Sequence, residues 1–305
     1  MNASPLRGFD LLGVPYDGQS TLGYPGSRDA PERVRRCAGW INMRIEGGKI
    51  YCLETNEEYE VGDKLLVDRG DLDVYPHDVL ATFASTVHGV RDTIAGGRVP
   101  IVIGGDDSIL FPVAQGVHDA LPGRIGIVHF DAHLDLMDES PRQGRYSQSS
   151  GMRRALELER VSPRDCIQLC ERHFNFPASG RFKRENGLVH LSARDVLKMG
   201  PQETVRHALE HTAGANHLFL SFDIDAIDPA YAPGAGAHEP GGISSAEALE
   251  MVELLAPHCA AMAITEVNPA TDHVDQTSML AAYLAFSFAV YGRKAAARKE
   301  PHLVR

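Results

Sequence analysis

The sequence has little positive charge and no hydrophobic run long enough to cross a membrane. Its 305 residues include 30 Lys and Arg against 41 Asp and Glu, which gives a formal net charge of −11. Affinity for nucleic acid and for anionic membranes comes from Lys and Arg that neutralise phosphates, so this excess of acid argues against both partners. The longest apolar run, Met279–Tyr291, is too short to span a bilayer and predicts a buried helix.

Secretion signals and paired cysteines are also missing. The first ten residues lack a basic segment followed by an apolar one, so we expect no secretory signal. The chain has only five cysteines, and the closest two, Cys166 and Cys170, fit neither a CxxC redox pair nor a zinc site. An odd number of scattered cysteines is typical of reduced thiols, which predicts a cytoplasmic protein.

Short apolar runs alternate with amphipathic segments along the whole chain. Eight of these runs are predicted strands: Phe9–Val14, Leu65–Val67, Val99–Ile103, Ile125–Phe130, Cys166–Leu169, Leu188–Leu191, Leu218–Phe222 and Ala260–Ile264. Helical spacing lies between most of them, as in Ser245–Leu255, which Ser244 and Glu247 open with a capping box. The alternation predicts an α/β fold whose parallel sheet is covered on both faces. Periodicity alone leaves an open sheet and a closed barrel as alternatives.

Nothing in the sequence divides the chain into domains. No Pro/Ser-rich linker, repeat or low-complexity tract is present, so residues 1–305 are predicted to form a single domain. Residues 44–61 are different in character: an apolar-alternating half and an acidic half lie on either side of Gly47 and Gly48. This pattern predicts a hairpin excursion with its turn at the two glycines.

Acidic residues follow four of the predicted strands. They lie in the segments Gly104–Ser108, Asp131–Asp135, Asp223–Pro229 and Thr265–Pro269. In α/β proteins, ligands bind beyond the carboxyl ends of the strands. So many carboxylates at one edge are costly unless a cation lies among them. The spacing therefore predicts a cation site.

The residue types suggest which cation is bound. Extended chain has a period of two, so Asp131, His133 and Asp135 can project to one side, as can Asp223 and Asp225. Carboxylates with an imidazole suit Mn²⁺ first, and Ni²⁺, Co²⁺ or Zn²⁺ as alternatives. The number of acids exceeds the need of one ion and predicts a pair, which would activate a bridging water for hydrolysis.

These segments resemble the ureohydrolase family, which includes arginase, agmatinase and guanidinobutyrase. The matching pieces are Gly104–Ser108 (family GGDHS), Asp131–Asp135 (DAHxD), Ser221–Pro229 (SFDxDxxDP), Glu266–Pro269 (EVNP), Gly26–Arg33 (PGxRxxPxxIR) and Gly234–Gly242 (GTGTPEPGG). The resemblance extends from about residue 8 to about residue 290 and is closest to the agmatinase-like branch.

The resemblance implies a three-layer α/β/α fold around an eight-stranded, mostly parallel open sheet. It also implies two divalent ions, manganese first and nickel second, and hydrolysis of a guanidinium C–N bond by a hydroxide that bridges the metals. By motif position, Asp131 and Asp223 would bridge the ions, His133 and Asp225 would complete one site, and Asp135 the other. Glu266 would hold the substrate guanidinium.

Two positions depart from the family pattern. The histidine of GGDHS is Asp107 here, and we expect Asp107 to ligate one ion through oxygen. The family also carries a proton-shuttling histidine in a stretch like YSHASPFRRALE, and the ungapped match Tyr146–Glu157 places Gln148 there. Glutamine is neither an acid nor a base at neutral pH, and positioned acid–base groups contribute roughly 10²–10⁴ in rate.

Other residues are candidates to replace the shuttle. His238 lies where the family loop has proline, and it is the predicted proton donor to the leaving amine. Gln148 is the second catalytic candidate, through hydrogen bonds that orient the substrate. His129, just before Asp131, is predicted to face the opposite side and to pack structurally.

The sequence therefore supports two interpretations. The first is a metal-dependent hydrolase of a small cationic guanidino compound such as guanidine, a biguanide or an agmatine-like amine, assembled as a homo-oligomer, a trimer or hexamer by the resemblance. The second is a catalytically degenerate subunit with a structural or regulatory role in a hetero-oligomer with a homologous chain. Metal content distinguishes them, because an active enzyme should hold about two ions per chain.

Overall fold

The computed structural model describes residues 7–294. Its strands are β1 (Phe9–Gly13), β2 (Lys49–Cys52), β3 (Glu57–Glu60), β4 (Leu66–Asp71), β5 (Val99–Ile103), β6 (Ile125–Phe130), β7 (Val161–Leu169), β8 (Val189–Leu191), β9 (His217–Asp223) and β10 (Cys259–Thr265). Its α-helices are α1 (Ala30–Asn42), α2 (Gly62–Leu65), α3 (Val79–Ala95), α4 (Leu110–Ala120), α5 (Gly151–Ala155), α6 (Pro177–Asn186), α7 (Ala193–His211), α8 (Ser245–Leu255) and α9 (Gln276–Gly292).

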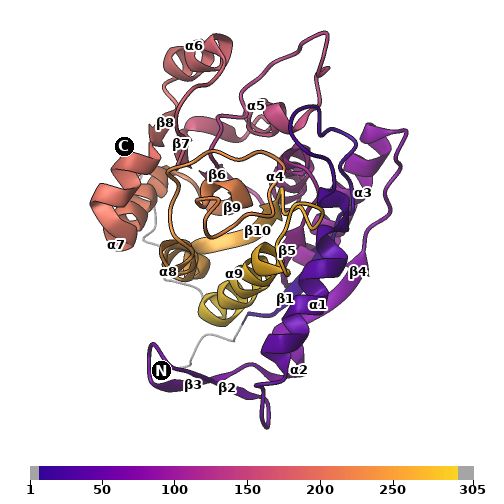
Figure 1. Ribbon diagram of the computed structural model, residues 1–305, viewed down its shortest axis with the longest axis vertical. Helices are drawn as coiled ribbons and strands as arrows, with labels where there is room; N and C mark the ends of the chain where they lie inside the picture. Colours follow the sequence, from indigo (N-terminus) through magenta and orange to yellow (C-terminus); the bar gives the residue numbers. More distant parts are fainter. Residues whose placement is uncertain (1–6, 295–305) are drawn as a thin grey trace.

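Eight strands form one open sheet in the order β4-β1-β5-β10-β9-β6-β7-β8, and every neighbouring pair is parallel. Helices α1, α9, α8 and α7 cover one face, and α3, α4 and α5 pack against the other (Figure 1). The predicted three-layer α/β/α fold is confirmed. The two edge strands, β4 and β8, lie at opposite ends of the sheet, which rules out the barrel.

The burial of the central strands explains why their sequences are continuously apolar. Every residue of β5 and of β6 is buried, as expected for strands covered on both faces. Helix α8 begins with the predicted capping box, in which Ser244 and Glu247 bond to each other's backbone nitrogens. The apolar run near the C-terminus forms α9, most of which is buried. None of the helices within residues 7–294 is both long and apolar enough to cross a membrane.

The excursion after α1 is a two-stranded antiparallel hairpin, β2 with β3, that projects from the bottom of Figure 1. Gly47 and Gly48 do form a tight turn with positive φ, but this turn leads into β2. The chain reverses between the strands at residues 53–56, so the predicted position of the hairpin turn is wrong. At this reversal Asn56 has a positive φ, the left-handed conformation that the prediction had assigned to Gly47 and Gly48.

Candidate metal centre

Four neighbouring strands end at the edge where the predicted acids lie. The order β5, β10, β9, β6 places these strands side by side, and their parallel direction brings all four carboxyl ends to one edge. β5 leads into a 3-10 turn at Asp107–Ile109, and β6 leads into Asp131–Asp135. Asp223 ends β9, with Asp225 just beyond it, and Glu266 follows β10. Residues from four distant segments therefore meet.

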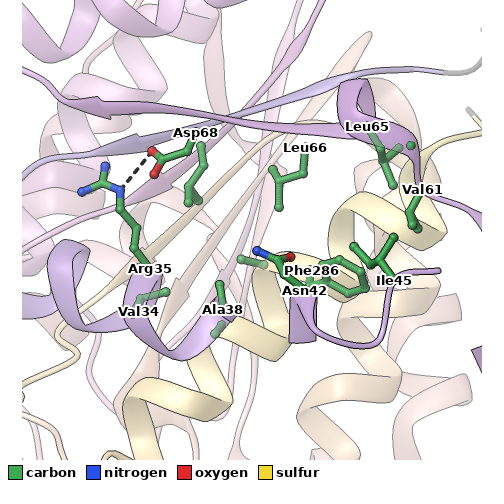
Figure 2. Close-up of a pocket in the computed structure, with 14 residues that line it drawn as sticks. Val34, Arg35, Ala38, Asn42, Ile45, Val61, Leu65, Leu66, Asp68 and Phe286 are labelled. Carbon is green, nitrogen blue, oxygen red and sulfur yellow. Dashed lines mark hydrogen bonds and ion pairs between the residues drawn. The ribbon is translucent and has the colours of Figure 1, made fainter. Parts of the chain in front are cut away.

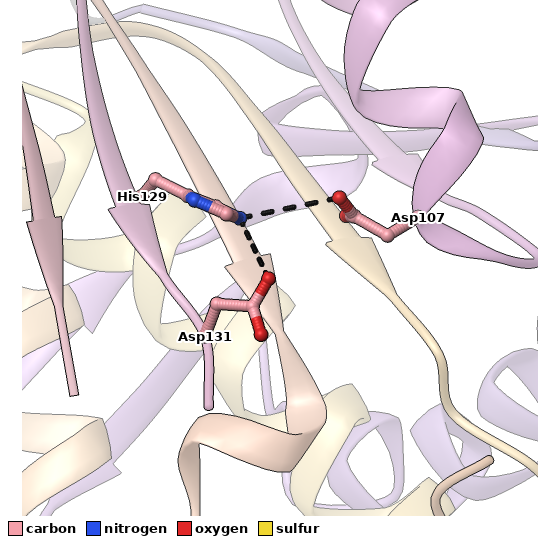
Figure 3. Close-up of side chains that lie close together, drawn as sticks. All are labelled: Asp107, His129 and Asp131. Atoms are coloured by element: carbon pink, nitrogen blue, oxygen red, sulfur yellow. Dashed lines mark ion pairs between the residues drawn. The ribbon is translucent and has the colours of Figure 1, made fainter. Parts of the chain in front are cut away.

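Asp107, His129 and Asp131 form the first cluster, and all three side chains are buried. Nε2 of His129 lies 3.1 Å from Oδ2 of Asp131 and 4.0 Å from Oδ2 of Asp107. Figure 3 shows the imidazole pointing between the two carboxylates. One potential ligand atom from each residue lies within 4.8 Å of the other two.

The position of His129 corrects the prediction that it faces away from the site. Side chains two residues apart on a strand project to the same face, so His129 in β6 lies on the same side as Asp131. The sequence spacing thus carried the signal that sequence reasoning missed. The prediction placed His129 on the opposite side as if it were adjacent to Asp131, but Phe130 lies between them.

Asp131, His133 and Asp225 form the second cluster, which shares Asp131 with the first. Nδ1 of His133 lies 3.0 Å from Oδ2 of Asp225 and 3.3 Å from Oδ1 of Asp131. Backbone N–H groups hold the carboxylates in place: that of Ala132 donates to Asp225 (2.9 Å), and that of His133 donates to Asp131 (2.6 Å). The ring of His133 is 29% exposed, so this cluster faces the cavity.

The two other predicted ligands, Asp135 and Asp223, lie beside the clusters but belong to neither group of three. Both are buried and both line the cavity over the centre. Oδ1 of Asp223 accepts a hydrogen bond from the backbone nitrogen of Asp225 (2.8 Å). Their role as metal ligands stays a prediction.

Local bonds fix the carboxylate of Asp107. The hydroxyl of Thr265, at the end of β10, donates to Oδ1 of Asp107 (2.7 Å). The backbone nitrogen of Asp107 donates to Oε1 of Glu266 (2.9 Å). The turn requires Gly105, because a Cβ there would lie 1.7 Å from the carbonyl oxygen of Tyr16. One oxygen of Asp107 is therefore held, while Oδ2 points at His129.

The electrostatics of the centre favour added positive charge. Burial raises the pKa of Asp107 to about 7, and burial together with neighbouring carboxylates raises the pKa values of Asp135, Asp223 and Glu266 well above their usual range. Burial would lower the pKa of His133, but the surrounding aspartates outweigh it and raise that pKa to about 12. A divalent cation would relieve the same excess of negative charge.

Unpaired buried atoms test whether a metal fits here. Oδ2 of Asp107, Nε2 of His129 and Oδ2 of Asp131 are all buried and form no regular hydrogen bond, although His129 and Asp131 form an ion pair at 3.1 Å. These three atoms come one from each member of the first cluster and converge on one point. Buried polar atoms are rarely left unpaired, because each costs about 1–3 kcal/mol. Two carboxylate oxygens and an imidazole nitrogen suit a divalent transition metal, so the residues fit the ion.

A cavity of about 80 Å³ opens over the centre. Its lining consists of Leu22, Asp107, His133, Asp135, Gln148, Ser149, Asn175, Phe176, Ser179, Asp223, Asp225, Ala237 and Glu266. No lysine or arginine is among these residues. Gln148 is anchored by a hydrogen bond from its Nε2 to the carbonyl of Leu22 (2.9 Å), and its Oε1 is buried without a partner.

His238, the predicted proton donor, is exposed and does not line this cavity. Its Nε2 lies 2.6 Å from the carbonyl oxygen of Pro233, within its own loop. The preceding residue, Ala237, does reach the cavity. Delivery of a proton by His238 would therefore require its side chain to leave Pro233, and the role stays a prediction.

A second cavity, of about 140 Å³, lies among α1, β4 and α9 and contains none of the clustered acids (Figure 2). Its walls are mainly apolar side chains such as Val34, Leu66 and Phe286. The guanidinium of Arg35 at its side pairs with Asp68 and with Asp71, so its charge is already balanced.

Comparison with known proteins gives one consistent family. The model of the arginase family matches residues 7–290. The chain is 29% identical to a guanidinopropionase of Pseudomonas aeruginosa over 290 residues, 94% of this chain and 87% of that protein. It is 27% identical to a mitochondrial guanidino acid hydrolase of Homo sapiens over 281 residues, 90% of this chain and 76% of that protein. The crystal structure of formimidoylglutamase from Bacillus subtilis superimposes with a TM-score of 0.82 at 27% identity, covering 96% of this chain and 88% of that one.

Proposed function

We propose that this chain, which belongs to the arginase family, is a metal-dependent hydrolase of a guanidino or amidino C–N bond in a small cationic substrate without a carboxylate. Guanidine, a biguanide and an agmatine-like amine are the candidates. The observation that carries the proposal is the cavity, whose charged walls are all acids apart from His133. Two relatives, the guanidinopropionase at 29% identity and the guanidino acid hydrolase at 27%, are named for guanidino acids.

A carboxylate on the substrate would find no cationic partner among the residues that line this cavity, only neutral donors such as Ser149, Asn175 and Ser179. Lysine and arginine are absent from its lining, while four aspartates and Glu266 are present. The acids of the centre are Asp107, Asp131, Asp135, Asp223, Asp225 and Glu266, and when ionised they exceed the charge of two divalent ions by about two. Two like charges about 6 Å apart repel by about 3 kcal/mol at an effective dielectric constant of about 20, which is more than a hundredfold in affinity.

A guanidinium, in contrast, has only N–H donors, and the cavity offers acceptors. The carboxylate of Glu266 lies beside Asp107 and supplies a charge-assisted acceptor. Gln148 supplies a second acceptor in its buried, unpaired Oε1, and its bond to the carbonyl of Leu22 fixes which end of the amide faces the cavity. We assign Gln148 to orienting the substrate and Glu266 to holding its charge.

The two clusters would hold the metal ions, with Asp131 shared between them and Asp135 and Asp223 adjacent. When bound, manganese or nickel would polarise both a water molecule and the group under attack. The chain's own residues bring the substrate carbon to that place and exclude bulk water, since the clustered acids are buried. A proton must then reach the leaving amine, and His238 is the proposed donor.

A catalytically degenerate subunit of a hetero-oligomer, the second interpretation, is not favoured. The predicted acids converge at one edge, and the substitution at position 107 keeps a carboxylate whose Oδ2 is unpaired and directed at the first cluster. A degenerate site would have no need to keep these buried charges together, because each unpaired one lowers stability.

Hydrolysis assays with matched substrates test the proposal. We expect chain prepared with manganese or nickel to release urea or ammonia from guanidine, a biguanide or agmatine, and to be at least about a hundredfold less active on 3-guanidinopropionate and arginine. Glu266→Gln keeps an acceptor oxygen but loses the charge, and should lower kcat/KM by about 10–100-fold. Preference for the guanidino acids would contradict the proposed substrate class. Inactivity of the metal-loaded chain on all of them would contradict the proposed function.

A further inference from the structure

His129 has the features of a ligand and not those of a packing residue. Its side chain is completely buried, and its Nε2 lies 3.1 Å from Oδ2 of Asp131 and 4.0 Å from Oδ2 of Asp107. That nitrogen therefore points into the space between two carboxylate oxygens (Figure 3). One imidazole nitrogen between two carboxylate oxygens is a donor set that suits a divalent transition metal.

The two clusters around Asp131 have the same composition. Each consists of two aspartates and one histidine, with His129 on one side of Asp131 and His133 on the other. His129 lies in β6, and His133 lies in the bend that follows Asp131. Two equal sets of donors, each with a convergent geometry, indicate two equal ligand roles.

The other nitrogen of the His129 ring contacts Gln168. Its Nδ1 lies 3.2 Å from Nε2 of Gln168, which also donates to the carbonyl of Leu134 (2.8 Å). The bond to Leu134 fixes the amide of Gln168, and Gln168 in turn fixes the orientation of the His129 ring from its Nδ1 side.

We propose that His129 is a metal ligand and that Asp107, His129 and Asp131 together hold one ion of a two-ion centre. This inference rests on the proposed function, because it presupposes a metal-dependent chain. It gives each ion one imidazole and therefore favours manganese, nickel or another transition metal over magnesium or calcium. Asp107 can supply only oxygen to this ion, and His129 would supply the nitrogen ligand.

Metal content of variants loaded with manganese alone tests the inference. We expect about two ions in the native chain and about one in His129→Leu, which keeps the bulk of the side chain but no ligand atom. Asp107→His in the His129→Leu background moves the imidazole across the cluster and should restore about two. His211→Ala removes another partly buried histidine, bonded to the carbonyl of Cys166, and should leave the content unchanged.

The outcomes separate this inference from the proposed function. Unchanged metal content in His129→Leu overturns the inference alone, whereas a native chain that binds neither manganese nor nickel overturns both. If His129→Leu does not fold, X-ray absorption of the native chain loaded with nickel decides the question. About one imidazole per ion supports ligation by His129, and about one imidazole per two ions, that of His133, overturns it.

Discussion

The two clusters of the centre share Asp131 but differ in how their polar atoms are paired. In the second cluster, backbone N–H groups at Ala132 and His133 already bond to the carboxylates, and the histidine contacts both aspartates. In the first, one atom of each residue is buried without a regular hydrogen bond, and the closest contact among them is the 3.1 Å ion pair between His129 and Asp131. The backbone of the bend at residues 131–133 supplies donors to both aspartates of the second cluster, whereas Asp107 lies in the turn after β5 and His129 lies within β6.

This comparison teaches which half of the centre depends on a bound cation. The second cluster is arranged by the chain itself and remains satisfied without an ion. In the first cluster, Nε2 of His129 and Oδ2 of Asp131 contact each other, whereas Oδ2 of Asp107 forms no hydrogen bond, and an unpaired buried atom costs about 1–3 kcal/mol. We therefore expect the first ion to contribute more to the stability of the fold and the second to bind to a preformed site.

Asp131→Asn breaks both halves at once and should have the largest effect. The substitution preserves shape but removes the charge that the two clusters share. We expect the chain to retain neither ion and hydrolysis to fall below detection, measured by elemental analysis and by urea release. Asp119→Asn, at an exposed acid on α4, is the matched control and should change neither quantity. A variant at 131 that kept full metal content would show that the clusters do not share this ligand.

Removing one acid from each half separates the two ions. Asp107→Ala should lower metal content to about one ion, and Asp225→Ala should do the same for the other ion. The Asp107 variant should retain the ion at His133, because the backbone bonds there do not involve position 107. Metal content with thermal unfolding checks this expectation. Loss of both ions from Asp107→Ala would mean that the second half is not preformed.

His238→Ala tests a residue outside both halves. If His238 supplies the proton to the leaving amine, kcat should fall by about a hundredfold while metal content stays unchanged. The hydrogen bond from its ring to Pro233 gives a second expectation, a slightly less ordered loop. His77→Ala, at another exposed histidine, is the control. Near-native turnover of His238→Ala would identify His238 as an ordinary loop residue.

Thr265→Val sharpens the comparison within the first half. It removes the hydroxyl that holds Oδ1 of Asp107 while keeping the shape of the side chain. Such supporting contacts are worth about 10–100-fold in metal affinity, so we expect one of the two ions to bind about tenfold more weakly. Thr204→Val removes a buried hydroxyl far from the centre and should leave both affinities unchanged. Equal weakening of both ions would contradict a local effect.

The smallest expected effect is the pH dependence of the metal-free chain. The folded pKa of Asp107 is about 7, above its usual value, so the folded state binds the extra proton between about pH 4 and pH 7. Stability should therefore fall as the pH rises through this range, and Tm with it. Asp107→Asn should flatten the profile, and adding manganese should restore Tm at pH 7. If the Tm of the metal-free native chain rose from pH 4 to pH 7 and that of Asp107→Asn did not, the expected direction of the pH dependence would be contradicted.

Local patterns predicted the strands of the sheet and the acids that follow them at its carboxyl edge. β5 and β6 have the predicted bounds, because strands covered on both faces must be apolar throughout. The capping box of α8 is likewise a property of a few adjacent residues. The spacing of Asp131 and His133, and of Asp223 and Asp225, predicted that these acids and the histidine would gather at one edge of the sheet.

Tertiary structure decided what depends on segments far apart in the sequence. The strand order places β10 and β9 between β5 and β6, and the turn after β5 brings Asp107 within 4.0 Å of the ring of His129. The reversal of the hairpin at residues 53–56 likewise depends on how β2 and β3 pair and not on the two glycines. Sequence alone fixed which residues can face the carboxyl edge, because period and turn chemistry are local. Packing fixed which of them meet, because side-chain contacts between distant strands are set by the order and register of the sheet.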